Sequence, residues 1–219
     1  MATQAKTLQI KQWESDFGRD YTDRNSLEPG ALDALYQKNY GLTRSQLNQR
    51  FLEGIPVDAR ILEVGCNTGN QLLVLQQMGF REIHGIEVQG YALERAESRV
   101  PGGRLLCASA FNIPYPSGYF DLVFTSGVLI HVAPEDVSRA MVEIHRCAGS
   151  YIWGLEYYAP ETTEVNYRGH QSLLWKTDFA GLYLKEFKDL ELVRLEYLPY
   201  LEGTNVDCMF LLRKTGAAH

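Results

Sequence analysis

The chain has 219 residues, of which 45% are hydrophobic and 22% charged, and its formal net charge is −6. This length allows one α/β domain with a well-formed core and an appended lid, but it is too short for two full domains. The acidic balance and the lack of a Lys/Arg-rich block argue against a nucleic-acid substrate or partner.

A candidate lid precedes the first strand, over residues 1–55. It begins as an irregular polar segment, but Trp13 and Tyr21 distinguish it from a disordered tail, which is poor in aromatic residues. Two interpretations remain open. In one, Trp13 and Tyr21 contact a substrate and Arg24 is available for a cofactor carboxylate; in the other, a helix packs on the outside of the domain. A helical pattern follows over residues 31–53.

The clearest signal lies in residues 60–70, which read R-I-L-E-V-G-C-N-T-G-N. A short apolar strand leads into a glycine loop, and a helix-period apolar pattern follows at once. Backbone N–H groups and the positive end of the helix dipole gather at such a turn, where glycine lets a ligand approach the backbone. We therefore predict a cofactor site that includes Glu63, Gly65, Asn67 and Gly69.

The spacing of this loop disfavours a dinucleotide, because Asn70 stands where the last glycine of G-x-G-x-x-G would be. Glu63 would repel a phosphate but suits a cationic ligand. The segment E-V-G-C-N-T-G resembles the first motif of class I S-adenosyl-L-methionine (SAM)-dependent methyltransferases, E/D-x-G-x-G-x-G, with Asn67 at the middle glycine. The resemblance implies SAM as cofactor and a Rossmann-like α/β fold with seven strands, mostly parallel, of which the last is antiparallel.

Two further cofactor contacts are expected after the second and third strands. The second strand ends at Glu87, about 20 residues beyond the glycine loop, as a ribose-binding carboxylate would. The third strand covers residues 104–107. In the methyltransferase family an Asp near its end takes the adenine amino group, and here Ser109 occupies that position, followed by Ala110.

The fourth strand, residues 119–125, is expected to bring Ser126 to the transferable methyl, since ligands of open α/β sheets bind at the carboxyl ends of the strands. His131 follows a few residues later. It is a candidate general base for an acceptor, because its unperturbed pKa is about 6.5. The other interpretation is a packing histidine that is hydrogen-bonded to the backbone.

The fifth strand, residues 150–156, has the apolar character of a central parallel strand. An insert over residues 157–185 follows it, and strands at 190–198 and 206–213 close the sheet. The SAM-binding domain is therefore expected to span residues 56–219, after the N-terminal helical lid, with no metal site.

Segments spread over nearly the whole chain, W-E-S-D-F-G-R-D-Y-T-D-R-N, E-Y-Y-A-P-E, Y-R-G-H and D-F-A-G-L-Y, resemble the methylases associated with pseudaminic acid biosynthesis. That resemblance implies an acceptor among sugars or related small metabolites. Candidate catalytic residues are His131, Glu156 and His170. Candidate substrate contacts are Trp13, Tyr21, Arg24, Tyr157, Tyr158, Tyr167 and Arg168.

The acceptor chemistry stays open at this point. An amine would suit Glu156 among tyrosines, a sugar hydroxyl would need His131 or His170 as base, and a carboxylate would use Arg168. The acid excess of the insert favours an amine-bearing acceptor. Alternatives are a guanidine or amine N-methyltransferase of natural-product biosynthesis, a non-catalytic SAM-binding subunit and an NAD-type Rossmann enzyme.

The cellular setting is expected to be cytoplasmic, without a membrane partner. The sequence begins with no apolar run of signal-peptide length, and no eighteen apolar residues occur in a row. The four cysteines form no C-x-x-C pair, which fits reduced thiols and argues against zinc. A monomer or a homodimer is expected.

Overall fold

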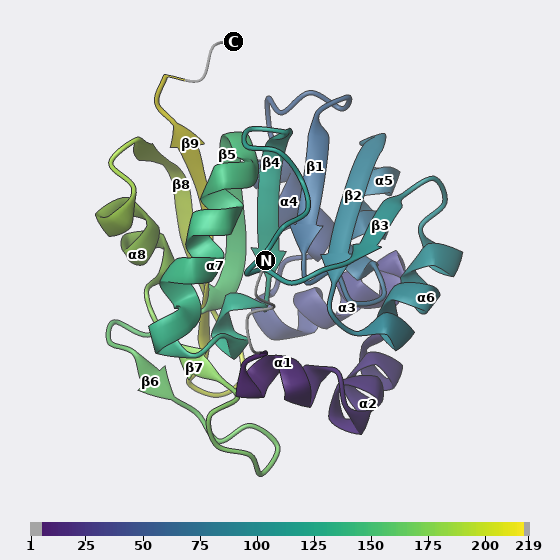
Figure 1. The fold of residues 1–219 in the computed structure, drawn as a ribbon, viewed down its shortest axis with the longest axis vertical. Helices are drawn as coiled ribbons and strands as arrows, with labels where there is room; N and C mark the ends of the chain where they lie inside the picture. Colours follow the sequence, from purple (N-terminus) through teal and green to yellow (C-terminus); the bar gives the residue numbers. More distant parts are fainter. Residues whose placement is uncertain (1–5, 217–219) are drawn as a thin grey trace.

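The computed structural model describes residues 6–216, and its centre is a seven-stranded sheet (Figure 1). In chain order its strands are β1 (Arg60–Val64), β2 (Glu82–Glu87), β3 (Arg104–Cys107), β4 (Phe120–Ser126), β5 (Ala148–Tyr157), β8 (Leu190–Pro199) and β9 (Val206–Lys214). Across the sheet the order is β3-β2-β1-β4-β5-β9-β8.

Strand direction confirms the predicted fold class. The five strands from β3 to β5 run parallel, whereas β9 runs antiparallel to both β5 and β8. Parallel neighbours need crossover connections, and three of these are the helices α5 (Asn70–Gln77), α6 (Gly90–Arg99) and α7 (Pro134–Cys147). All seven strands lie within two residues of the bounds that the sequence predicts.

The core lies on both faces of the sheet, because successive residues of a strand point to opposite sides. Leu62, Val64 and Val123 pack on one side with α7 and α8 (Phe179–Glu186). Ile61 and Leu122 pack on the other side with α5 and α4 (Arg44–Phe51). The parallel strands are therefore covered on both faces.

Helix α7 illustrates how the sequence places a helix on this sheet. Proline stands at its first turn with two acids, and a histidine and an arginine stand in its last turn, which suits the helix dipole. Its buried residues recur at helical spacing: Val137, Ala140, Met141, Ile144 and Cys147.

The N-terminal segment is helical, which corrects the expectation of an irregular start. Helices α1 (Leu8–Trp13), α2 (Asp16–Asn25) and α3 (Pro29–Tyr40) lie along the edge where the parallel strands end (Figure 1). Thr7 and Ser15 cap the first two helices by accepting hydrogen bonds from backbone N–H groups. The apolar signal of α2 is weak because its buried residues are Gly18 and Thr22. Residues 1–5 of the expected lid lie outside the described residues.

The insert after β5 contains a short two-stranded ribbon, β6 (Thr163–Glu164) and β7 (Trp175–Lys176), and continues into α8. Leu173, Leu174 and Trp175 are buried, so its second half packs on the domain. No helix within residues 6–216 combines the length and the apolar character needed to cross a membrane.

Replacing Gly154 of β5 tests the packing of the two antiparallel neighbours. Gly154 pairs with Phe210 of β9, and a Cβ at Gly154 would lie 2.2 Å from Phe210 Cζ. We expect Gly154→Ala to lower the free energy of unfolding by about 1–3 kcal/mol, because a buried ring must move. Urea unfolding measures this. Gly90→Ala is the control, since no atom lies within 4 Å of its added Cβ; equal stability of both variants would contradict the packing argument.

Candidate active site

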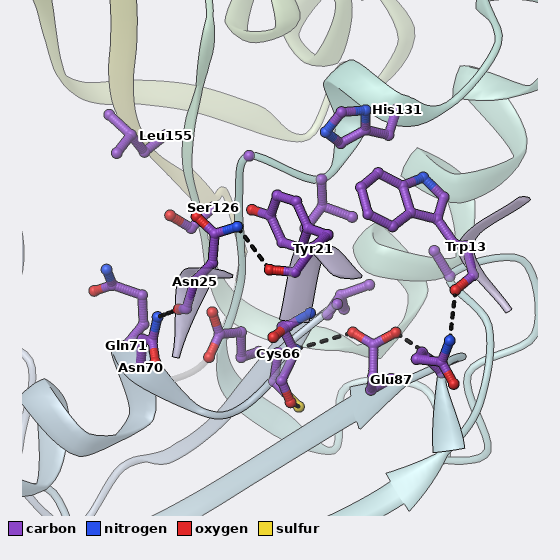
Figure 2. Close-up of a pocket in the computed structure, with 18 of the residues that line it drawn as sticks. Trp13, Tyr21, Asn25, Cys66, Asn70, Gln71, Glu87, Ser126, His131 and Leu155 are labelled. Atoms are coloured by element: carbon purple, nitrogen blue, oxygen red, sulfur yellow. Dashed lines mark hydrogen bonds between the residues drawn. The ribbon is translucent and has the colours of Figure 1, made fainter. Parts of the chain in front are cut away.

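A cavity of about 380 Å³ lies where β1, β2, β4 and β5 end, beneath the N-terminal helices (Figure 2). This volume falls in the range of small-molecule sites. In Figure 2, Tyr21 projects into the middle of the cavity, with His131 and Trp13 on one side and Glu87 on the other. The cavity thus lies at the carboxyl ends of the parallel strands, where ligands of open α/β sheets bind.

The two glycines of the loop after β1 are required for different structural reasons. Gly65 lines the cavity with φ of +74°, and a Cβ there would lie 2.7 Å from a methyl of Val128. Gly69 also has positive φ, but its added Cβ would lie 2.4 Å from a methyl of Val100, the residue that follows α6. Gly69 is absent from the cavity lining, so the structure gives it a role in helix packing.

Asn67 keeps the backbone conformation that a glycine would adopt at the middle motif position. Its φ is 45°, in the left-handed region that Asn tolerates better than most residues. The side-chain Oδ1 accepts from the N–H of Thr68 at 2.8 Å, and Nδ2 donates to Thr22 Oγ1 at 3.0 Å. The substitution therefore adds a hydrogen bond between the loop and α2.

Glu63 places a buried carboxylate on the cavity wall. The residue is 3% exposed, and its Oε2 has no hydrogen-bond partner among the described residues. Burial raises its pKa well above the usual range, opposed by the Arg44 guanidinium and reinforced by the Glu87 carboxylate. Gln71, also on the wall, has an equally unpartnered Oε1. A buried acceptor without a donor fits an ammonium ligand.

Glu87 joins the loops that follow β1 and β2. Its Oε1 accepts from the N–H groups of Val88 and Gln89 at 2.8 and 2.9 Å, and its Oε2 accepts from Asn67 N–H at 2.9 Å. Burial raises its pKa against the effect of these bonds. Oε1 thus accepts two hydrogen bonds, whereas Oε2 accepts one and keeps a further lone pair for a ligand hydroxyl. Ser109, Ala110 and Ser126, the other predicted cofactor contacts, line the same cavity.

His131 shows features of both interpretations that the sequence leaves open. Its Nδ1 lies 2.6 Å from the carbonyl oxygen of Leu173, which can only accept, so Nδ1 carries the proton and Nε2 is free in the neutral ring. Burial lowers its pKa to about 4, opposed by that hydrogen bond. The ring lines the cavity and packs against Trp13 at 4.7 Å between centroids.

Glu156 lies outside the cavity, which corrects the expectation that all three residues ending β5 reach the active edge. Alternate residues of a strand face opposite sides, so Leu155 and Tyr157 line the cavity while Glu156 does not. Its carboxylate, 1% exposed, accepts from the N–H groups of Val128 and Ile130 and so fixes the turn η1 (Leu129–His131).

Further predicted contacts also lie outside the cavity lining, although Tyr167 packs against the lining residue His131 at 5.2 Å between ring centroids. Tyr158 packs against Tyr197 at 4.6 Å between ring centroids. Arg24 is exposed on α2. The tip of the insert carries the remaining three, outside the cavity lining: Tyr167, Arg168 and His170. Trp13, Tyr21 and Tyr157 are the predicted substrate contacts that do line it.

Sequence reasoning missed Arg44, which is fully buried beside the cavity. Its guanidinium donates to Asn48, Tyr36 and Ser126, and its Nη2 has no partner among the described residues. The capping box that starts α4 marks the helix but gives no sign of this burial. Other missed lining residues are Asn25, Tyr36, Tyr40, Gln71, Tyr200 and Asp207.

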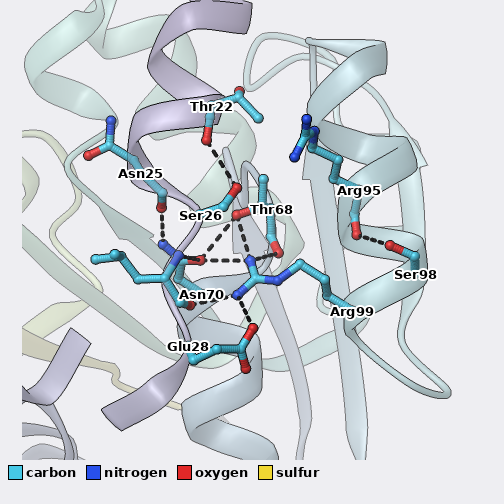
Figure 3. Close-up of polar contacts among 10 residues, drawn as sticks. Thr22, Asn25, Ser26, Glu28, Thr68, Asn70, Arg95, Ser98 and Arg99 are labelled. Carbon is cyan, nitrogen blue, oxygen red and sulfur yellow. Dashed lines mark hydrogen bonds and ion pairs between the residues drawn. The ribbon is translucent and has the colours of Figure 1, made fainter. Parts of the chain in front are cut away.

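A polar network fastens the N-terminal helices to the loop after β1 (Figure 3). Asn70 Nδ2 donates to the carbonyl of Asn25 at 2.6 Å. Arg99 of α6 donates to Thr68 and to the carbonyl of Leu27, at 2.7 and 2.6 Å. Gln89 also donates to the carbonyl of Trp13. Helices α1 and α2 are thus held down by these hydrogen bonds together with aromatic contacts, in which Trp13 packs against His131 and Phe17 against Tyr167.

Comparison with known proteins agrees with this geometry. Residues 62–150 match the family model described as "Methyltransferase domain". The human protein named methyltransferase-like protein 27 is 38% identical over 154 residues, which cover 69% of this chain and 55% of that protein. The phosphoethanolamine N-methyltransferase of Plasmodium falciparum is 21% identical, over 63% of this chain and 47% of that enzyme.

Among solved structures, the 1,6-didemethyltoxoflavin-N1-methyltransferase of Burkholderia thailandensis matches with a TM-score of 0.70 at 15% identity, over 97% of this chain and 93% of that one. At this identity the match shows the fold alone. The chain spans between 30% and 55% of the length of the curated relatives it matches.

Residues 62–150 thus carry the match to the methyltransferase family, and the chain has the Rossmann-like α/β fold of class I SAM-dependent methyltransferases. SAM is the methyl donor of the family whose model matches residues 62–150. The narrower resemblance to the methylases associated with pseudaminic acid biosynthesis is not supported by these matches.

Substitution of Glu156 tests its position beneath η1. Glu156→Ala leaves the N–H groups of Val128 and Ile130 without an acceptor, and we expect it to lower the free energy of unfolding by about 1–3 kcal/mol. Glu156→Gln keeps an acceptor oxygen and should cost less. Chemical unfolding at pH 7 compares the two, with exposed Glu161→Gln as control; equal losses in all three variants would contradict this placement.

The stability difference between wild type and Glu156→Gln should depend on pH. Burial raises the pKa of Glu156 from 4.5 to about 7, opposed by hydrogen bonds from Thr125 and the backbone at residues 128–130. The folded state therefore binds the Glu156 proton more tightly than the unfolded chain does. The stability that protonated Glu156 contributes is fully present below pH 4.5 and is lost as the pH rises through about 7. We expect the Gln variant to gain stability relative to wild type between pH 5 and 8. A pH-independent difference would contradict this.

Proposed function

We propose that the chain is a SAM-dependent methyltransferase that transfers a methyl group to a nitrogen or oxygen atom of a small molecule, foremost an amine-bearing metabolite or an amino sugar. The observation that carries the proposal is that Glu63 and Glu87, which lie near the ends of the adjacent strands β1 and β2, both line the cavity beside one glycine loop. One carboxylate lacks a donor and the other is ordered by backbone N–H groups.

The residues on the wall fit SAM group by group. Glu63 would hold the ammonium of the methionine part, and Glu87 would accept from the ribose hydroxyls. Ser109 and Ala110 would contact the adenine, and Ser126 would lie beside the methionine part. The bound cofactor supplies a methyl group whose carbon–sulfur electron pair returns to sulfur when a nucleophile attacks. An ammonium bound to Glu63 would favour the ionised carboxylate and so lower the pKa that burial raises.

The charge of the cavity wall supports an amine-bearing acceptor. Glu63, Glu87 and Asp207 line the cavity, and none of the lining residues within 6–216 is a lysine or an arginine. A phosphate or a carboxylate acceptor would meet three carboxylates in the lining, whereas Arg44, an arginine beside the cavity, donates to the lining residues Tyr36 and Ser126. Arg168, the sequence-based candidate for a carboxylate, is exposed outside the lining. Two of the matched proteins are named as N-methyltransferases, which is consistent with nitrogen as the acceptor atom.

For a hydroxyl acceptor, His131 is the proposed base on the cavity wall. Because burial lowers its pKa to about 4, the ring is neutral near pH 7 and its free Nε2 can accept a hydrogen bond from an acceptor. The buried aromatic wall keeps water away from the reacting atoms. Alignment of the reactants can supply about 7–11 kcal/mol, so the chain mainly has to position them.

Helices α1 and α2 are the proposed lid of this site. Helices of 6 and 10 residues are too short to be stable alone, so their order depends on the contacts with the loops below. Those contacts are the hydrogen bonds of Asn67, Asn70, Gln89 and Arg99. A ligand would enter when these bonds open, which costs far less than global unfolding.

Calorimetric titration with SAM, S-adenosylhomocysteine and NAD tests the cofactor assignment. We expect SAM and S-adenosylhomocysteine to bind and NAD not to bind. Glu63→Gln should weaken SAM by roughly tenfold to a hundredfold, because a charged hydrogen bond is lost. Exposed Glu161→Gln is the matched control. Binding of NAD instead, or equal SAM affinity in both variants, would contradict the assignment.

Replacing the Asn67–Thr22 pair tests the lid. Asn67→Gly keeps the left-handed backbone but loses the bond to Thr22, and Thr22→Val removes the acceptor with little change in shape. We expect each to speed hydrogen exchange in α2 by an amount equivalent to about 0.5–1.5 kcal/mol. The double variant should add little to either single variant. Unchanged exchange in α2 would refute the coupling.

A further inference from the structure

A third carboxylate, Asp207, stands at the end of the cavity away from Glu87. It is the second residue of β9 and pairs directly with Tyr157, the last residue of β5. Cross-strand partners share a face of the sheet, so both side chains line the cavity. Asp207 is 4% exposed, which makes its carboxylate a buried charge that needs partners.

The partners that Asp207 has are neutral. Its Oδ2 accepts from the hydroxyl of Tyr40 at 2.6 Å, and its Oδ1 accepts from Asn205 Nδ2 at 3.1 Å. Two cations act on it through space, but Lys176 donates to Asn205 and Arg44 donates to Tyr36. Neither cation donates to Asp207 itself, so each carboxylate oxygen retains a lone pair for a ligand donor.

Tyrosine rings surround this carboxylate on the cavity wall. Tyr40 packs against Tyr200 at 4.9 Å and against Tyr36 at 5.3 Å between centroids, and Tyr157 lies opposite Asp207. We call these four tyrosines and Asp207 the tyrosine box. Cations of this chain already lie over two of these rings, Lys176 over Tyr157 at 5.6 Å and Arg44 over Tyr36 at 5.3 Å from the ring centroids, so the rings suit a cation. A carboxylate beside the other two rings, Tyr40 and Tyr200, adds a hydrogen-bonded counter-charge for a ligand cation.

We infer that the tyrosine box holds the ammonium group of the methyl acceptor, and that the acceptor class is therefore a primary or secondary amine bound as its cation to Asp207. The inference rests on the proposed function, because it names the acceptor of the same site. It keeps Tyr157 but replaces Glu156, the acid that the sequence favoured for this role, with Asp207 of β9. The other tyrosines come from α3 and from the loop between β8 and β9.

The sheet keeps this box apart from the cofactor carboxylates. Glu63 ends β1, and β4 and β5 lie between β1 and β9. Three steps of about 4.8 Å separate these strands by roughly 14 Å. Ser126 and Leu155, which pair between β4 and β5, line the cavity in the interval. A cofactor ammonium at Glu63 and an acceptor ammonium at Asp207 therefore do not compete for one carboxylate.

An ammonium must give up a proton before its nitrogen can attack, because its lone pair is otherwise occupied. Asp207 is the base in contact with it, and the proton then passes from the carboxylate to water. Burial raises the pKa of Asp207 to about 6, opposed by Tyr40, Lys176, Asn205 and Arg44, which makes the carboxylate a stronger base than an exposed one.

Matched probes test the box in full-length protein saturated with S-adenosylhomocysteine: benzylamine, benzyl alcohol and benzoate, which share a ring but differ in charge. We expect benzylamine to bind more tightly than the other two. Asp207→Asn should weaken benzylamine by about tenfold or more and leave benzyl alcohol unchanged. Asp189→Asn is the control, because Asp189 bonds His145 outside the cavity lining. Equal affinity of amine and alcohol, or equal benzylamine affinity in both variants, overturns the inference.

A second pair of variants separates the aromatic contribution from misfolding. Tyr200→Phe keeps the ring and Tyr200→Leu removes it, so only the latter should weaken benzylamine. Unchanged affinity for S-adenosylhomocysteine shows that each variant is folded. The amine titration is also run without S-adenosylhomocysteine. If wild-type protein does not bind S-adenosylhomocysteine, the proposed function is wrong. If it binds S-adenosylhomocysteine but does not prefer benzylamine to benzyl alcohol, only the inference about the tyrosine box is wrong.

Discussion

The Glu87 carboxylate is the constraint on which the cofactor end of the structure depends. Three backbone N–H groups from two loops converge on it, and those loops follow neighbouring parallel strands. This arrangement fixes Asn67 in a left-handed conformation, and from there the side chain of Asn67 reaches α2. One buried acid thus orders the glycine loop and, through it, the cover of the cavity. Because that order comes from hydrogen bonds, it persists only while the carboxylate is in place.

Much of the fold follows from sequence periodicity, because parallel strands buried on both faces give short continuous apolar runs that are easily recognised. The loop after β1 and the acid that ends β2 were also predictable, since both are local features at known spacing. Helices α1 and α2 were not, because their buried positions are small or polar, as at Gly18 and Thr22. Hydrogen bonds to distant loops and a few aromatic contacts, such as Trp13 with His131, hold them in place.

The errors at the site have a geometric origin. The sequence places Glu156, Tyr157 and Tyr158 at one edge, but the pleat sends only the middle one into the cavity. Asp207 could not be paired with Tyr157 before the register of β5 and β9 was known, since 50 positions of sequence separate them. The arginine beside the cavity is Arg44, whereas the sequence-based candidate is Arg24. Both arginines belong to helices, and the sequence pattern does not show that Arg44 is buried and Arg24 exposed.

Burial gives the three cavity carboxylates a common electrostatic character. The pKa of Glu63, of Glu87 and of Asp207 is raised, in each case chiefly by loss of solvent. A raised pKa means that the folded state holds the proton more tightly, so the contribution of each group to stability falls as the pH rises above its usual pKa. The burial of these carboxylates therefore makes the fold less stable than its packing would allow. A cation offsets this penalty and an anion adds to it, so the same burial that weakens the free protein selects the charge of its ligands.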